Sequence, residues 1–206
     1  MTILFEVIAL VLALTLHEFA HALVGDYLGD DTARRHGRLS LNPLSHIDPF
    51  STLLLPLVLI LVGSPVIFAA AKPVPFNPWA VRYGRFGAAM IAAAGPLTNF
   101  FIATFLGLYL RFVPVGVTGY QFLGTIVVIN LTIGLFNLIP FPPLDGSRLL
   151  YAVAPRALRD VMDQIEKAGL MAVLLLMFIA YPFIAPILSR ITTSIITLLI
   201  PGVGLP

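Results

Sequence analysis

Five consecutive residues near the start of the sequence have the residue types of a hydrolytic metal site. The run His17-Glu18-Phe19-Ala20-His21 is an HExxH motif in a segment made mostly of Leu, Val, Ala and Ile. Histidines four positions apart share one face of a helix, so both imidazoles can reach one Zn²⁺ ion. Glu18 lies beside them and can take a proton from a water at the metal. The motif therefore predicts metal-dependent hydrolysis.

The apolar surroundings of the motif strengthen this interpretation. A single histidine in a membrane helix is more often a hydrogen-bonded packing residue, and a single glutamate can belong to a proton path. Here three ionisable groups fall within about one turn, and each charged group at a bilayer centre costs roughly 2.5 to 3.5 kcal/mol on insertion scales. Packing alone gives no reason to keep all three.

A catalytic zinc site normally takes three protein ligands, so a third ligand is needed. The sequence contains no cysteine, which leaves His, Asp or Glu. His36 and His46 lie in a polar loop, and Glu6 lies near the opposite end of the first helix. Asp145 follows an apolar segment in the run 137–146, whose prolines break the helix beside the carboxylate. Irregular backbone at membrane depth is tolerated where it lines a cavity, which makes Asp145 the best third ligand.

Two asparagines in apolar segments are candidates for contact with a substrate. Asn137 lies eight residues before Asp145, and its amide could hold a substrate backbone or stabilise the oxyanion of a tetrahedral intermediate. Asn99 has the same candidate role, with a hydrogen bond between helices as an equally expected alternative. We assign no role to Asn130.

The segments that position these residues have the composition of a membrane protein. Of the 206 residues, 59% are hydrophobic and 11% are charged, against roughly a quarter charged in soluble domains. The mean hydropathy is +0.99. We therefore predict an all-α polytopic protein with about five to six membrane segments, the last stretch being divided by prolines and Arg190. The apolar stretches are residues 3–24, 51–71, 87–112, 121–139 and 168–201.

The chain is expected to divide into a catalytic membrane core, residues 1–150, and C-terminal membrane helices, residues 151–206. Alternation in residues 37–43 predicts a short β strand at the membrane surface, either as a connector or as a pairing edge for substrate. The proline-rich run 72–78 must be extended.

The orientation follows from the need to bring His21 and Asp145 to one depth. Both lie toward the C-terminal ends of their helices, so those helices must run in the same direction. We therefore predict that residues 51–71 form a re-entrant or surface-lying hairpin rather than a simple span. Ten of the twelve Lys and Arg residues then face one side. The positive-inside rule places that side, and the site, at the cytoplasmic face of the plasma membrane, with the N-terminus outside.

Three motifs together resemble the site-2 protease family of intramembrane zinc metalloproteases, in its short prokaryotic branch without PDZ or CBS domains. They are His17 to His21, Ala94-Gly-Pro-Leu-Thr-Asn99, and Asn137-Leu-Ile-Pro-Phe-Pro-Pro-Leu-Asp-Gly146. The likeness covers roughly residues 5–150. It implies that His17, His21 and Asp145 bind one zinc ion, that Glu18 activates the water, and that the substrate is a transmembrane segment of another protein.

Two other functions are compatible with an intramembrane His, Glu and Asp cluster. A metal-ion or proton transporter would use the same residues as an ion path, although the sequence shows no internal repeat. A catalytically inactive protein that captures membrane helices is a further alternative. The net charge of +2 does not indicate a nucleic-acid partner, because the basic residues are scattered in short loops. Oligomeric state is not predicted.

Overall fold

The computed structural model describes residues 2–54, 57–58, 61–63 and 71–200, and helix dominates throughout these ranges. By length and composition, the described residues contain four helices able to cross a membrane. This confirms the predicted polytopic all-α fold. The four are α1 (Thr2–Tyr27), α4 (Arg85–Phe112), α5 (Val117–Asn137), and a bent segment, Met171–Leu199, within α8 (Leu170–Leu175), η3 (Leu176–Ala180) and α9 (Tyr181–Leu199).

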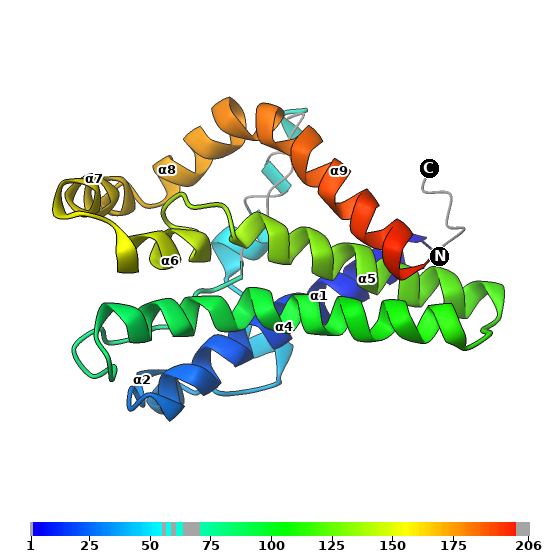
Figure 1. The fold of residues 1–206 in the computed structure, drawn as a ribbon, viewed down its shortest axis with the longest axis horizontal. Helices are drawn as coiled ribbons and strands as arrows, with labels where there is room; N and C mark the ends of the chain where they lie inside the picture. Colours follow the sequence, from blue (N-terminus) through cyan, green and yellow to red (C-terminus); the bar gives the residue numbers. More distant parts are fainter. Residues whose placement is uncertain (1, 55–56, 59–60, 64–70, 201–206) are drawn as a thin grey trace.

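Helices α1, α4 and α5 lie alongside one another and form the centre of the molecule (Figure 1). Helix α4 runs opposite to α1, and α5 runs in the same direction as α1. This is the arrangement predicted from the need to bring His21 and Asp145 together. Small side chains allow the close packing: Ala103 of α4 has no exposed surface and contacts a cluster that includes Val127 and Leu131 of α5.

The last membrane segment is bent rather than divided. It changes direction at η3, a short π-helical stretch, and Pro182 follows in the first turn of α9. Proline has no N–H to donate to the preceding turn, which explains a bend at this position. Beyond the bend, Ile196 and Leu199 of α9 pack against the cluster between α4 and α5. Pro186 and Arg190 lie within α9 without ending it.

The predicted strand at residues 37–43 is wrong. These residues form bends and turns, followed by the 3₁₀ helix η1 (Pro43–His46), and no strand occurs in any described range. The loop bonds to itself instead of to a second strand. The Arg38 guanidinium donates to the Ser45 carbonyl, and His46 Nε2 donates to the Ser40 carbonyl at 2.8 Å.

The predicted hairpin at 51–71, re-entrant or surface-lying, lies outside the described residues at 55–56, 59–60 and 64–70. The structure describes its beginning, where a π-helical turn, η2 (Pro49–Leu54), follows η1.

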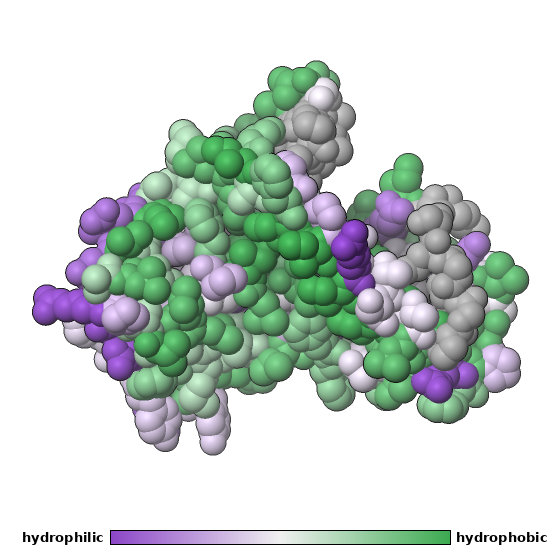
Figure 2. Space-filling model, turned by 45° about the horizontal axis from the view of Figure 1, so that its top comes forward, coloured by the Kyte–Doolittle hydropathy of each residue, from purple (hydrophilic) through white to green (hydrophobic). Residues whose placement is uncertain are grey.

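Three short helices gather at one end of the bundle, beside the N-terminal end of α4 (Figure 1). They are α2 (Thr32–Arg35), α6 (Asp145–Val153) and α7 (Arg156–Lys167). An ion pair between Arg148 and Glu166 joins α6 to α7. Figure 2 shows a broad apolar surface over the middle of the molecule, with hydrophilic residues toward both ends. Such a surface suits a bundle whose middle faces lipid.

Candidate metal centre

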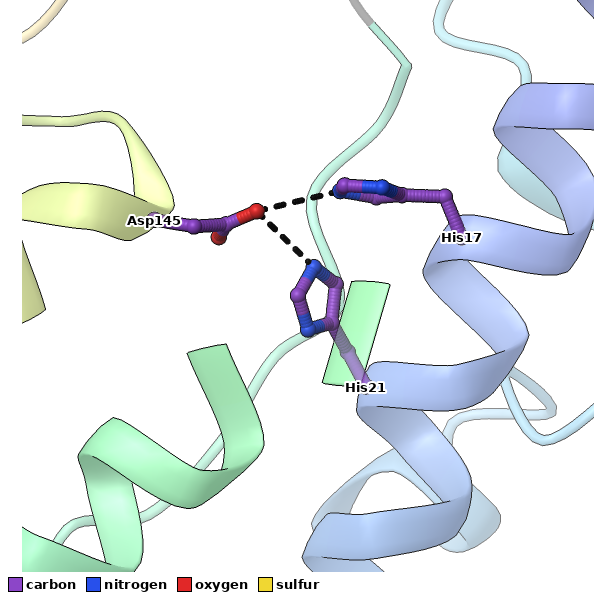
Figure 3. Close-up of side chains that lie close together, drawn as sticks. All are labelled: His17, His21 and Asp145. Carbon is purple, nitrogen blue, oxygen red and sulfur yellow. Dashed lines mark ion pairs between the residues drawn. The ribbon is translucent and has the colours of Figure 1, made fainter. Parts of the chain in front are cut away.

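The structure brings His17, His21 and Asp145 together. His17 and His21 project from one face of α1, and Asp145 is the first residue of α6 (Figure 3). The Nε2 atoms of His17 and His21 lie 3.1 Å and 3.3 Å from Oδ2 of Asp145. Each residue offers one nitrogen or oxygen atom that can bind a metal, and these three atoms lie within 4.8 Å of one another. Among the described residues, this is the cluster found with side chains placed to hold a metal ion.

The other candidates for the third ligand lie elsewhere. His36 is exposed and its ring donates to Thr32 O. His46 is buried in η1, and Glu6 is exposed in the early turns of α1. Asp145 is therefore the carboxylate that the fold offers to the HExxH motif, more than a hundred residues along the chain.

Both imidazoles are held in the tautomer that metal binding through Nε2 requires. Nδ1 of His21 lies 2.7 Å from the carbonyl oxygen of Ile91, which can only accept, so Nδ1 donates. Nδ1 of His17 donates to Oδ1 of Asn99 at 2.6 Å. Each Nε2 lone pair then faces Asp145. Such partners behind a histidine ligand fix its orientation and raise its basicity.

The three residues fit a divalent cation. Oδ2 of Asp145 is buried and receives no hydrogen bond, and an unsatisfied buried oxygen calls for a partner. Two imidazole nitrogens and one carboxylate oxygen are a donor set that zinc accepts, with a fourth position left for water.

Gly95 of α4 gives the two imidazoles the space they occupy. A Cβ atom at this position would lie 2.5 Å from His21 Nε2 and 2.6 Å from His17 Nε2. Sequence reasoning assigned no role to this glycine. A signal was present, because glycine inside a helix costs about 1 kcal/mol relative to alanine and usually has a packing reason.

A tight turn between α5 and α6 places Asp145. Helix α5 ends at Asn137, before the prolines, and α6 begins at Asp145. The turn is compact at Gly146, where an added Cβ would lie 2.2 Å from the carbonyl oxygen of Leu138.

Asn99 does not have the geometry of a substrate contact. It has no exposed surface, and its oxygen accepts from His17. Its Nδ2 donates to Asn130 Oδ1 at 2.8 Å. These bonds match the alternative role that the sequence suggested, hydrogen bonding between helices. They also show that Asn99 holds the His17 ring. Asn130 was missed, although an amide inside an apolar helix must find a partner.

Asn137 is half-buried, and its Nδ2 donates to Ile133 O in its own helix at 3.0 Å. Its contact with substrate stays a prediction.

Glu18 is half-buried beside the two histidines on α1. Its Oε2 accepts a hydrogen bond from the backbone N–H of Val74 at 3.3 Å. Val74 belongs to the proline-rich run 72–78, in which residues 72–77 lie in no helix or strand and Pro78 begins a turn. The contact with Glu18 was not foreseen.

Comparison with known proteins identifies relatives. The model of "Peptidase family M50" matches residues 114–180. A Bacillus subtilis protein named "Putative zinc metalloprotease YwhC" is 38% identical, over 82% of this chain and 78% of its own length. "Putative zinc metalloprotease Rip2" of Mycobacterium tuberculosis is 29% identical, over 86% of this chain and 65% of its own length. "Zinc metalloprotease MJ0392" of Methanocaldococcus jannaschii is 42% identical over 32% of this chain and 20% of its own length. No solved structure matches the chain significantly.

Proposed function

This chain belongs to peptidase family M50, the site-2 protease family of zinc metalloproteases, and we propose that it cleaves peptide bonds in or near transmembrane segments of other membrane proteins. The observation that carries the proposal is the triad His17, His21 and Asp145, in which two buried imidazoles on a long apolar helix meet a half-buried carboxylate at the start of α6. We assign these three residues as the ligands of one zinc ion per chain.

Each residue of the site has a distinct task in this mechanism. Bound zinc would supply a Lewis acid that polarises the scissile carbonyl and lowers the pKa of a water molecule. Glu18 takes the proton of the attacking water and passes it to the leaving amine. Asn99 and the Ile91 carbonyl hold the imidazoles in place. The Asn137 amide is the candidate for stabilising the oxyanion.

A transmembrane substrate must unwind before it is cut. Every carbonyl inside a helix is bonded within the helix, so a closed helix offers no free peptide group. The pairing edge expected at residues 37–43 is absent, and we propose no strand pairing there. We place this local unwinding beside the turn between α5 and α6, where the chain leaves the helix before Asp145.

We propose that this end of the molecule faces the cytoplasm of a cell whose plasma membrane holds the protein, with the N-terminus outside. Support comes from the elements gathered there, because α2, α6, α7 and the start of α4 carry most of the basic residues. These are Arg34, Arg35, Arg85, Arg148, Arg156, Arg159 and Lys167.

A comparison of the wild type with Glu18→Gln tests the proposed function. Both proteins are purified, their bound zinc is measured, and each is incubated with a reporter that contains one transmembrane helix. We expect zinc in both and cleavage only by the wild type. Ion transport that survives Glu18→Gln, with no proteolysis by either protein, would replace the protease with a transporter.

A further inference from the structure

A segment outside any helix or strand passes beside the site before the chain enters α4. We call residues 71–77 the strap, and none of them lies in a helix or a strand. Figure 3 shows it as the pale green coil that passes behind the three labelled side chains. Hydrogen bonds fix it near both ends. The N–H of Lys72 donates to the carbonyl of His46 at 2.8 Å, and the N–H of Asn77 donates to Oδ2 of Asp30 at 2.6 Å.

Both anchors of the strap are buried. Asp30 is 2% exposed and also accepts from the backbone and the hydroxyl of Thr32. His46 is 3% exposed in η1. A carboxylate with all these bonds holds the strap firmly, because charge-assisted hydrogen bonds are the stronger kind.

Between its anchors, the strap has one donor beside Glu18. Pro73 and Pro75 have no N–H, and Val74, which lies between them, donates its N–H to Glu18 Oε2 at 3.3 Å. The prolines also restrict the backbone here to extended conformations. The local sequence thus places a single backbone N–H against the carboxylate and keeps it there.

Phe76 connects the strap to the third ligand's helix. Its ring lies 5.4 Å from the guanidinium carbon of Arg148, in the first turn of α6, three residues after Asp145. Phe76 also packs against the buried residues Leu28, Val81 and Ile91. The strap is therefore in contact with α6, with α4 and with α1.

We propose that the Val74 N–H is a positioning group for the reaction, which holds one oxygen of Glu18 so that the other faces the attacking water. The inference rests on the proposed role of Glu18 as the proton acceptor. A free glutamate side chain has several rotamers, and fixing one of its oxygens removes part of that freedom before the reaction begins.

Amide hydrogen exchange tests the contact without any reaction. Residues 72–78 contain four backbone N–H groups, those of Lys72, Val74, Phe76 and Asn77. In Glu18→Ala we expect the Val74 hydrogen to exchange at least ten-fold faster, while the hydrogens of Lys72 and Asn77 keep their protection. An unchanged rate at Val74 would show that Glu18 does not hold this N–H and would overturn the proposal.

Steady-state kinetics test the consequence for catalysis. Val74→Pro removes the N–H and suits an extended chain, so we expect kcat to fall at least ten-fold with KM within two-fold of the wild type and zinc content unchanged. Val74→Ala keeps the N–H, so we expect its kcat to stay close to the wild-type value. A kcat for folded, zinc-containing Val74→Pro that equals the wild-type value would overturn the proposal.

A second variant covers the case in which Val74→Pro does not fold. The α-hydroxy analogue of valine at position 74 replaces the Pro73–Val74 peptide bond with an ester, which removes the same hydrogen and keeps the side chain. We expect the same fall in kcat, and wild-type kinetics in the ester would overturn the proposal. Failure of the wild type itself to cleave any transmembrane reporter would instead contradict the proposed function.

Discussion

Gly95 is the residue at which α4 approaches the two imidazoles most closely. A Cβ atom there would lie 2.5 to 2.6 Å from ring atoms of His21 and His17, so Gly95→Ala is expected to displace at least one imidazole. We expect the purified variant to lose stoichiometric zinc, as measured by elemental analysis. Gly124→Ala in α5 is the matched control, because an added Cβ there meets no atom within 4 Å. Full zinc occupancy in Gly95→Ala would mean that the imidazoles lie elsewhere.

If His17 binds zinc as proposed, its hydrogen bond to Asn99 should support zinc binding. Asn99→Leu removes the acceptor of the His17 Nδ1 hydrogen, and loss of such a partner typically lowers metal affinity by about 10- to 100-fold. Titration against a zinc chelator measures this change. Asn137→Ala serves as the comparison, since the Asn137 amide bonds within its own helix. We expect Asn137→Ala to keep the zinc affinity of the wild type and to have a lower kcat. A zinc affinity of Asn99→Leu equal to that of the wild type would contradict the role assigned to Asn99.

At the scale of residues, the sequence predicted which ionisable side chains come together better than it predicted their hydrogen-bond partners. His17, Glu18 and His21 are recognisable because their spacing is local, and Asp145 because few ionisable groups remain in the apolar chain. The bond from His17 to Asn99 joins residues 82 positions apart. No spacing rule along one helix predicts such a partner, so the role of Asn99 became clear only from the packing of α1 against α4.

The turn between α5 and α6 determines where Asp145 lies. In Gly146→Ala the added Cβ would lie 2.2 Å from Leu138 O, a backbone atom that cannot move away cheaply. We expect loss of zinc together with a loss of stability of about 1 to 3 kcal/mol, measured by thermal unfolding in detergent. Gly116→Ala, where an added Cβ is free of contacts, is the control. An unchanged unfolding temperature and full zinc in Gly146→Ala would show that the turn is less compact than described.

At the scale of elements, long apolar stretches were predictable and loop conformation was not. Hydropathy alone located α1, α4 and α5, because their length matches the bilayer. The alternation of residue types in 37–43 predicted a β strand, but a β strand is stable only when a second strand pairs with it. Arg38 and His46 instead close the loop on itself. Pro182 and Pro186 predicted that the last apolar stretch is divided in two. The structure instead has one bent segment, and Ile196 and Leu199 beyond the bend pack against α4 and α5.

The orientation of the whole molecule can be tested by labelling, because the sequence contains no cysteine. Asp160→Cys lies exposed on α7, and Thr118→Cys lies exposed at the start of α5, at the opposite end of the bundle. We expect a membrane-impermeant maleimide to label Thr118→Cys in intact cells and Asp160→Cys only after the membrane is opened. The reverse pattern would place the site outside the cell.

At the scale of the whole molecule, the relative direction of α1 and α5 could be predicted from the sequence, whereas details of the path of the chain between them could not. Two ligands on α1 and one after α5 must share a depth, and this single requirement fixed α1 and α5 as parallel. The side of the membrane on which they meet is our proposal, based on the basic residues of α2, α6 and α7. The path of residues 51–71 between these helices stays a prediction, since residues 55–56, 59–60 and 64–70 lie outside the described ranges.

The most direct measurement of the central claim is an X-ray anomalous difference map, recorded at the zinc absorption edge from crystals of the zinc-loaded protein. We predict one strong peak about 2.0 to 2.2 Å from His17 Nε2, from His21 Nε2 and from a carboxylate oxygen of Asp145. A peak that lacks Asp145 as a ligand, or a loaded protein with no peak between α1 and α6, would contradict the account.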